Sequence, residues 1–363
     1  MGSVHRDTRT KKPSWRVAYT KPDGNDTTKS GFRTKREAEA FLATTEVSKL
    51  RGNYIAPSDA RVTVENLGTA WLLSHRAAVK PSTYHSDESA WRVHVMPQWG
   101  SRAVGSIRHT EVTTWIAGLT AAKSATTVKR VHGVLAAILD TAVRDQRIAS
   151  NPARDVKTPR KVAKSRPYLT VCQVESLAAA SKYPTSILFL AYTGLRWGEA
   201  TGLKVKFVDQ ARRRVEVVEN AVVVNGHVEV GTPKTHERRS VPYPEFLSEA
   251  ITAACAGKHR DALVFQSEEG GYLLPGNSKG GWFKGAVKRA QAGDEHFPRL
   301  TPHGLRHTAA SLAISAGANV KVVQRMLGHA SAAMTLDRYA DLFPDDLDTV
   351  AEALGRLRAD RLT

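Results

Sequence analysis

The sequence predicts a multidomain α+β protein, and three observations lead to that prediction. At 363 residues the chain is longer than one ordinary domain, and it has enough apolar residues for more than one core. Strand-like alternation near the N-terminus gives way to a long stretch with helical periodicity, and a hairpin signal then appears in an otherwise helical C-terminal part. We therefore expect a small sheet with one helix in residues 1–55, an all-α domain of four helices in residues 62–153, and a mainly α domain with a small sheet in residues 168–363.

The charge of the chain indicates a polyanionic partner. There are 53 Lys and Arg against 35 Asp and Glu, which gives a formal net charge of +18. Nucleic acid is the commonest polyanion that a soluble protein meets, so the composition favours nucleic-acid binding.

The cysteines and the lack of long apolar segments indicate the compartment. Cys172 and Cys255 lie in apolar, helix-like contexts without a CxxC pair, which indicates neither a disulfide framework nor a zinc site. The N-terminus is polar, and no run of 18 apolar residues occurs. We expect a soluble protein in a reducing, cytoplasmic compartment, without a membrane segment or a bound metal.

The first domain begins with strand signals. Residues 14–19 alternate apolar and polar side chains, residues 22–25 are typical of a turn, and a second strand is expected at 27–32. Thr34 and Glu37 form a capping-box signature that opens a helix. Basic residues crowd this small domain, and they favour either DNA binding or a merely solvated face: Lys11, Lys12, Arg16, Lys21, Lys29, Arg33, Lys35 and Arg36.

The second domain follows a Gly- and Pro-containing linker at 51–60. Helical patterns begin at Thr63, span 81–95, and follow Thr110. The clearest pattern lies between Val128 and Ala142, where apolar residues recur at helical spacing. Basic side chains here can follow a DNA backbone, although a solvated helix face is the simpler interpretation: Lys123, Lys129, Arg130 and Arg144.

Residues 151–167 are interpreted as an extended linker between domains. They contain three prolines and six Lys or Arg against one Asp. Such a linker can lie across phosphates with Arg160, Lys161 and Lys164.

The third domain contains two groups of polar residues with chemical potential. After a capping box at Thr170, the run A-Y-T-G-L-R-W-G-E places Arg196 at a helix start, with Glu199 three residues later where it can orient the guanidinium. Strands are expected at 214–218, 221–224 and 227–230, with an Asn-Gly hairpin turn. Lys234 follows in a loop between strands.

The second group lies between Thr301 and Tyr339. His303 and Arg306 are three residues apart in a helical pattern, His329 follows Gly328 at the end of another, and Tyr339 comes ten residues later. Singly, each is most simply an ordinary polar, solvated or half-buried residue. Together they suit attack on phosphorus, with the tyrosine as nucleophile and the cationic groups offsetting charge on the non-bridging oxygens.

These motifs resemble the tyrosine recombinases, in particular the three-domain, arm-binding phage integrases of the mycobacteriophage type. The resemblance rests on T-G-L-R-W-G-E at 193–199, Lys234 on the β-hairpin, H-G-L-R-H at 303–307, L-G-H at 327–329, and Tyr339. It implies that Arg196 and Arg306 grip the scissile phosphate and that Tyr339 forms a 3′-phosphotyrosyl bond. It also implies that Lys234 protonates the leaving 5′-oxygen, that His303 and His329 assist catalysis, and that Glu199 has a supporting role.

The same resemblance implies what the protein does and with whom. The expected function is integration and excision of a phage genome, by a homotetramer on double-stranded DNA with core-type and arm-type sites. A host DNA-bending protein and a phage directionality factor are expected partners, in a nucleoid-associated setting. Residues 1–55 resemble an arm-binding domain and residues 62–153 a SAM-like core-binding domain. No cofactor is expected, because the sequence lacks a phosphate-binding G-x-x-x-x-G-K loop and a carboxylate cluster for Mg²⁺.

Other functions remain open from the sequence. A type IB topoisomerase uses the same chemistry, and a cellular chromosome-dimer-resolving or mobile-element recombinase is a nearer alternative. A non-catalytic DNA-binding regulator needs only the basic helices. Beyond Pro344 an apolar stripe predicts a C-terminal helix that packs on its own domain or on a neighbouring protomer: Leu347, Val350, Leu354 and Leu357.

Overall fold

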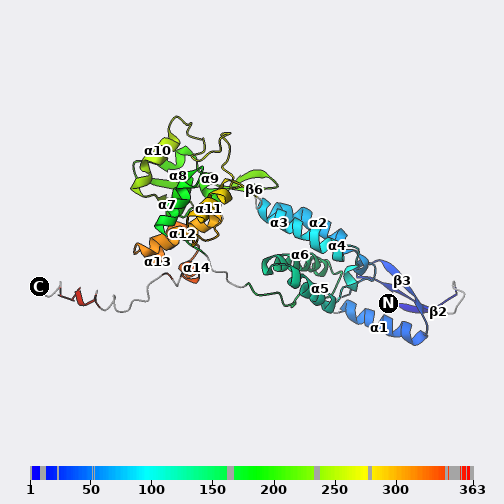
Figure 1. Cartoon of the computed structure of the whole chain (residues 1–363). Coiled ribbons are helices and arrows are strands. Elements are labelled where there is room, and N and C mark those ends of the chain that lie inside the picture. Colours follow the sequence, from blue (N-terminus) through cyan, green and yellow to red (C-terminus); the bar gives the residue numbers. More distant parts are fainter. Residues whose placement is uncertain are drawn as a thin grey trace. The chain divides into compact units, whose positions relative to one another are not determined.

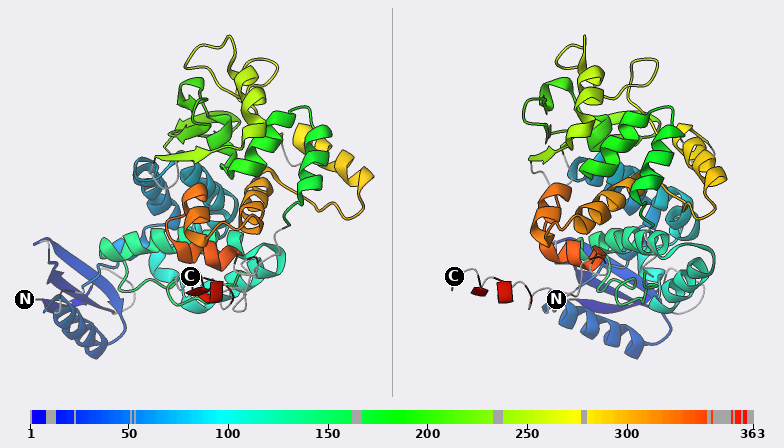
Figure 2. Two further views of the ribbon diagram at one scale, coloured as in Figure 1. Left: turned by 90° about the vertical axis from the view of Figure 1, so that its left-hand side faces the viewer. Right: turned by 60° about the vertical axis from the view of Figure 1, so that its left-hand side comes forward.

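The computed structural model divides into two compact units, Met1–Ala163 and Lys164–Thr363. It describes the chain apart from residues 1, 9–13, 23, 51, 53, 162–166, 233–237, 277–279, 340–341, 343–351, 353, 357 and 360–363. Figures 1 and 2 show the elements of both units. No helix among the described residues is long and apolar enough to cross a membrane.

The N-terminal part of the first unit is a three-stranded antiparallel sheet covered by one helix. The strands β1 (Ser3–Asp7), β2 (Ser14–Thr20) and β3 (Asp26–Phe32) lie in the order β1-β2-β3, and α1 (Lys35–Leu50) follows. Val17, Tyr19 and Ala38 form its small buried core. The two strands and the helix expected from the sequence are present. The strand β1 was missed because it has a single apolar residue and no alternation.

The rest of the first unit is helical. It contains α2 (Val64–Ala78), α3 (Pro81–Ala90), a π-helical turn (Trp91–Val95), α4 (Met96–Trp99), α5 (His109–Ala122) and α6 (Ala125–Arg144), with short 3-10 turns at Asp59–Arg61 and Val104–Ser106. The Thr63 and Ser124 side chains accept backbone N–H groups at the starts of α2 and α6. Because eight residues of α6 are buried, this amphipathic helix forms the centre of the core, as its sequence pattern indicated.

The linker expected at 151–167 begins later than the sequence suggested. Ala153 and Val156 are buried in the helical core. Asn151 donates from its side-chain amide to the Ala136 carbonyl at 2.8 Å, and His132 Nε2 lies 2.7 Å from the Ala153 carbonyl oxygen. Residues 151–156 are therefore part of the folded helical layer: α6 ends at Arg144, and the chain packs back on the helical core despite Pro152.

The second unit is a helical assembly with two small sheets. Its helices are α7 (Val171–Ala179), α8 (Pro184–Thr193), α9 (Trp197–Thr201), α10 (Ser248–Cys255), α11 (Trp282–Gly293), α12 (Pro302–Ser315), α13 (Val320–Leu327) and α14 (Ala332–Tyr339), with 3-10 turns at Val205–Phe207 and Glu245–Leu247. One sheet has the order β4 (Val208–Asp209), β5 (Arg214–Val217), β8 (Arg239–Pro242). The other is the hairpin of β6 (Asn220–Val224) and β7 (His227–Gly231). Asn225 and Gly226 both have positive φ, as a primed two-residue hairpin turn requires.

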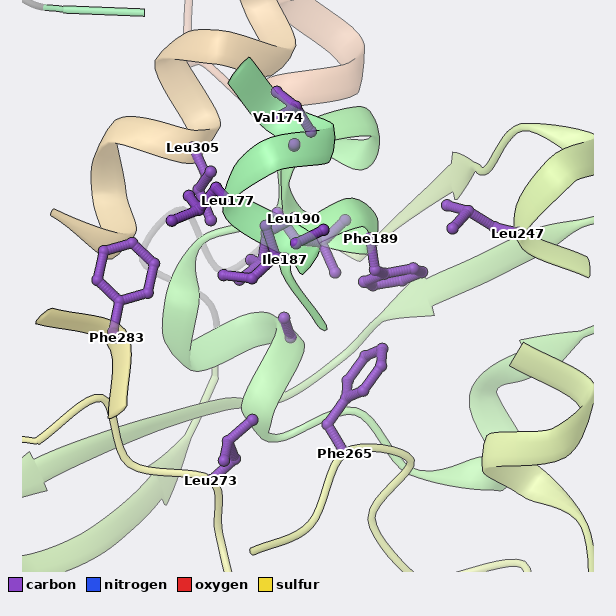
Figure 3. Close-up of a cluster of buried hydrophobic side chains, with 14 of the residues drawn as sticks. Val174, Leu177, Ile187, Phe189, Leu190, Leu247, Phe265, Leu273, Phe283 and Leu305 are labelled. Carbon is purple, nitrogen blue, oxygen red and sulfur yellow. The ribbon is translucent and has the colours of Figure 1, made fainter. Parts of the chain in front are cut away.

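A single large apolar core holds this unit together. Figure 3 shows side chains of α7, α8, α11 and α12 meeting there, and Phe265 and Leu273 reach it from loops. Leu169, just before α7, donates its backbone N–H to Thr308 Oγ1 of α12. The core thereby holds the C-terminal end of α8 and the first turns of α12, where the candidate site residues lie. The C-terminal helix expected beyond Pro344 lies mostly outside the described residues; of its apolar stripe only Leu354 is described, and it is exposed.

Candidate active site

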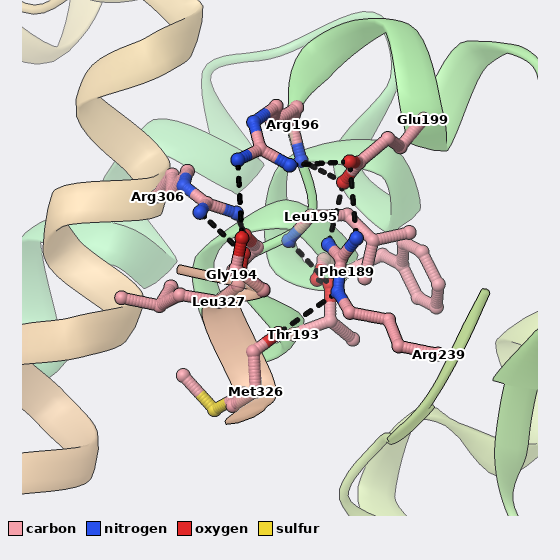
Figure 4. A network of polar contacts seen from close by, with 11 residues as sticks. Phe189, Thr193, Gly194, Leu195, Arg196, Glu199, Arg239, Arg306, Met326 and Leu327 are labelled. Carbon is pink, nitrogen blue, oxygen red and sulfur yellow. Dashed lines mark hydrogen bonds and ion pairs between the residues drawn. The ribbon is translucent and has the colours of Figure 1, made fainter. Parts of the chain in front are cut away.

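Three consecutive carbonyl oxygens at the end of α13 each accept a hydrogen bond from a different arginine. Arg239 donates to the Met326 carbonyl at 3.3 Å, Arg306 donates to the Leu327 carbonyl, and Arg196 donates to the Gly328 carbonyl at 3.4 Å. The last carbonyls of a helix have no partners within the helix and carry partial negative charge, so they suit guanidinium groups. Arg306 of α12, Arg239 of β8 and Arg196, the residue just before α9, thereby meet at one point, which Figure 4 shows in close-up.

Two glycines with positive φ shape this meeting point. Gly194 ends α8 at φ 65° and Gly328 ends α13 at φ 61°. The Gly194 carbonyl accepts a hydrogen bond from Arg306 Nη1 at 2.6 Å. A Cβ atom at Gly194 would lie 2.7 Å from Leu327, and one at Gly328 would lie 3.0 Å from Arg239. The glycines of the T-G-L-R and L-G-H motifs are therefore required by backbone conformation and by close packing.

Glu199 is the buried counter-ion of this cluster. It accepts a hydrogen bond from the Arg196 side chain at 2.7 Å and one from the Arg196 backbone N–H at 2.8 Å, so the two residues that the sequence places three apart are in direct contact. Arg239 binds the same carboxylate from the other side. Burial by itself raises the pKa of Glu199, but the hydrogen bond and charge of Arg239 and the charge of Arg196 outweigh it and lower the pKa to about 2. Glu199 is therefore ionised at neutral pH.

Arg306 is buried, with 2% of its surface exposed. Burial, followed by the nearby charge of Arg196, lowers the pKa of Arg306 to about 9. The guanidinium stays mainly protonated at pH 7. Two cations, Arg196 and Arg306, therefore lie close together, with Glu199 as a partial counter-charge, and this arrangement favours an added anion such as a phosphate.

Tyr339, the last residue of α14, points its hydroxyl at a histidine of α12. The hydroxyl oxygen lies 2.6 Å from Nδ1 of His307, and both side chains are buried. The tyrosine ring packs on α12 and α13 in a small apolar cluster with Ala310, Ile314 and Leu327. This cluster fixes the ring, so that the hydroxyl lies near the arginines rather than in solvent.

His329 follows Gly328 and is also buried. Its Nδ1 lies 2.9 Å from Thr335 Oγ1, while its buried Nε2 has no hydrogen-bond partner among the described residues. Burial, and then the charges of Arg306 and Arg338, lower the pKa of His329 to about 3. The imidazole is neutral at pH 7, and an unsatisfied buried nitrogen beside two arginines is suited to meet a phosphate oxygen.

Not every expected residue lies in this cluster. His303 is exposed at the start of α12, and its ring lies against that of His307 with centroids 5.1 Å apart. Lys234 falls outside the described residues, as do the expected DNA-binding residues Lys11, Lys12 and Lys164.

The other expected DNA-binding residues have varied surroundings. Arg33, Lys129, Arg160 and Lys161 are exposed, whereas Arg16 is half-buried in β2. The Lys29 ammonium lies 4.2 Å from the centre of the Phe41 ring, and Arg130 forms an ion pair with Asp87 at 2.8 Å. These two cations are therefore already engaged within their own unit.

Three residues of the cluster were missed by sequence reasoning. They are Arg239, His307 and Thr335. His307 lies in the quoted H-G-L-R-H run, but its identity as the tyrosine's partner depends on which side of α12 is buried. Arg239 lies 40 residues from Glu199 and carries no local signal.

Comparison with known proteins agrees with this geometry. Residues 167–345 match the phage integrase family, and residues 64–159 match the phage integrase central domain. The integrase of Mycobacterium phage L5 is 28% identical over 345 residues, covering 90% of each chain.

Solved structures give the same result. The Tn1549 transposon integrase in complex with transposon right end DNA is 26% identical, with a TM-score of 0.67 over 82% of this chain and 100% of that one. A lambda integrase tetramer bound to a Holliday junction shares the fold at 15% identity, with a TM-score of 0.57 over 87% of this chain and 93% of that one. The chain therefore belongs to the phage integrase family, and it is a site-specific DNA recombinase of the tyrosine type.

Proposed function

We infer that this recombinase integrates a phage genome into a bacterial chromosome and excises it again at attachment sites. The observation that carries the inference is the convergence of Arg196, Arg306, His329 and Tyr339 at the end of α13. The similarity to the L5 phage integrase over 90% of both chains supports the phage role. Because the Tn1549 integrase is also similar, movement of a transposable element is the second candidate.

The proposed chemistry is transfer of a DNA phosphodiester to the enzyme and back. The Tyr339 hydroxyl oxygen attacks the scissile phosphorus, the bond to the 5′-oxygen breaks, and a 3′-phosphotyrosyl bond forms. Arg196 and Arg306 donate hydrogen bonds to the non-bridging oxygens and disperse the charge that grows in the in-line transition state. His329 donates to the same oxygens from Nε2, and exposed His303 assists from the rim.

The leaving group needs a proton, and the rejoining step reverses the first. Lys234 protonates the 5′-oxygen as it leaves. A 5′-hydroxyl from another strand then attacks the phosphotyrosyl bond and reseals the DNA without ATP, because one ester has been exchanged for another. No cofactor enters this scheme.

The domains have separate tasks in this proposal. The sheet-and-helix domain of residues 1–55 binds arm-type DNA, the helical SAM-like domain of residues 62–153 binds core DNA, and residues 168–363 carry catalysis. The active form is a homotetramer on DNA, assisted by a host bending protein and a phage directionality factor. It works on the bacterial nucleoid in the cytoplasm.

The decisive test of the chemistry is Tyr339→Phe. A suicide substrate nicked beside the cleavage point traps the wild-type covalent adduct, and the variant should form none while binding DNA with nearly unchanged affinity. An adduct formed by the variant would contradict the assignment of the nucleophile. Sequencing the junctions formed with candidate phage and host DNA distinguishes phage integration from element transposition.

A further inference from the structure

His307 is the histidine whose ring nitrogen touches the reacting oxygen of the proposed nucleophile. Its Nδ1 lies 2.6 Å from the Tyr339 hydroxyl, and the contact joins α12 to α14 across 32 residues of sequence. The exposed surface is 8% for His307 and 3% for Tyr339, so bulk water has little access to either group. The Tyr339 hydroxyl therefore has a candidate proton acceptor in direct contact, shielded from bulk water.

The other two histidines of the site are placed differently. His303 is exposed, and its ring packs edge-on against His307. The ring of His329 lies parallel to that of Tyr339 with centroids 6.5 Å apart, and its Nδ1 is engaged by Thr335. Among the contacts between described residues, the one that places a histidine ring nitrogen on the tyrosine hydroxyl is that of His307.

We propose that His307 is a further catalytic residue, which takes the Tyr339 proton during cleavage and returns it during rejoining. The proposal rests on the proposed function of Tyr339 as nucleophile. In cleavage, the proton passes from the hydroxyl oxygen to Nδ1 of neutral His307 as the oxygen–phosphorus bond forms and the bond to the 5′-oxygen breaks. In rejoining, the imidazolium returns that proton to the tyrosine oxygen as the phosphotyrosyl bond breaks.

The charges around His307 suit this exchange. It shares α12 with His303 and Arg306, His329 faces it from the end of α13, and Tyr339 faces it from α14. Arg196, just before α9, adds its charge beside Arg306 and His329. Positive charge nearby favours a neutral imidazole before reaction and an ionised tyrosine during it. A tyrosine titrates about 3 to 4 units above a histidine in water, so transfer is efficient only while the oxygen–phosphorus bond forms.

The first test compares His307→Asn with wild type. The Asn amide can hydrogen-bond near the Nδ1 position but cannot take a proton at neutral pH. Single-turnover cleavage of a nicked suicide substrate should be about 10²- to 10³-fold slower at pH 7. The variant's rate should rise with pH between 6 and 9, because the tyrosine must then ionise unaided, whereas the wild-type rate levels off.

Matched controls separate chemistry from folding. His296→Asn makes the same substitution at an exposed loop position of the same unit and should leave cleavage unchanged. Gel-shift affinity and the thermal midpoint of His307→Asn should stay near those of wild type. Cleavage within threefold of wild type, or a slow rate with the wild-type pH profile, would overturn the proposal.

A measurement on the wild-type protein covers the case in which the variant does not fold. A substrate with a 5′-bridging sulfur needs no proton on its leaving group, so a remaining solvent deuterium isotope effect belongs to the tyrosine proton. We expect cleavage to be about two- to threefold slower in D₂O with this substrate, and equal rates would overturn the proposal. An adduct from Tyr339→Phe would refute the proposed function instead, independently of His307.

Discussion

Arg239 donates hydrogen bonds from both terminal nitrogens to the carboxylate of Glu199, from Nη2 to Oε2 at 2.6 Å and from Nη1 to Oε1 at 3.1 Å. The Glu199 side chain is fully buried and that of Arg239 is 11% exposed. This pair joins β8 to α9, and the same Arg239 reaches the Met326 carbonyl at the end of α13. Arg196, the proposed phosphate-binding arginine, is therefore held by the Glu199 carboxylate, which Arg239 holds in turn.

Removing Arg239 should leave Glu199 as a buried carboxylate with only one ionic partner. We expect Arg239→Gln to lower the free energy of unfolding by about 3 to 5 kcal/mol, measured by urea denaturation. The free energy of unfolding of Arg239→Lys should lie between those of wild type and Arg239→Gln, because an ammonium keeps the charge but cannot reproduce the two-point contact. The exposed Arg212 is a matched control, and Arg212→Gln should cost less than about 0.5 kcal/mol. Equal losses at the two positions would show that the pair contributes nothing.

Stability should fall in acid through Glu199. The pKa of Glu199 is lowered from 4.5 to about 2 in the folded protein, so the stabilisation is complete above the unfolded value and is lost as pH falls through the folded one. It amounts to about 3 kcal/mol, of which about 2 kcal/mol should be gone at pH 3. Urea titrations at pH 5 and pH 3 should give a smaller pH effect in Glu199→Gln than in wild type. The other carboxylates titrate in both proteins and contribute equally. An identical loss of stability between pH 5 and pH 3 in both proteins would therefore contradict the role of Glu199.

Thr335 should determine which nitrogen of His329 carries the proton. His329 is neutral at pH 7, because its pKa is lowered to about 3. A neutral imidazole has one N–H group, so Nε2 can donate to a phosphate oxygen only when Nδ1 accepts the hydrogen bond of the Thr335 hydroxyl. Thr335→Val should therefore slow cleavage about tenfold, which corresponds to the net free energy of one hydrogen bond. Thr335→Ser keeps the hydroxyl and should retain most of the wild-type cleavage rate. Single-turnover rates of the two variants decide this, and equal rates would mean that Thr335 does not set the tautomer.

Removing the N-terminal domain should separate cleavage from integration. The hydroxyls of Tyr19 and Tyr54 lie 2.9 Å apart, whereas the Val104 backbone N–H donates to the Val62 carbonyl at 2.9 Å, so the two folded parts divide between residues 54 and 62. Deleting residues 1–57 should leave cleavage of a core site near the wild-type rate and reduce integration at least tenfold. Integration assays with and without arm-type DNA measure this. Undiminished integration would rule out an arm-binding role for the segment.

The sequence by itself determined most of the elements and pointed to the proposed chemistry. Helices with long apolar stripes, such as α6, were found because a 3.6-residue period repeats over several turns. The Asn225-Gly226 turn was found because few residue pairs tolerate two positive φ angles. Arg196, Glu199, Arg306, His329 and Tyr339 could be proposed from the sequence because they stand in short local runs, and two of these runs, T-G-L-R and L-G-H, carry a glycine with positive φ.

Tertiary structure decided the partners. His303 and His307 are four residues apart on one helix, and a period of 3.6 places them on nearly the same side, so only the packing of α14 determines that His307 rather than His303 meets Tyr339. The strand β1 pairs with β2 although its own residues lack alternation, and residues 151–156 pack on α6 although prolines suggested a linker. Arg239 belongs to the site because a buried carboxylate 40 residues away requires a second cation, and the free energy of burying a charge depends on the whole fold rather than on neighbouring residues.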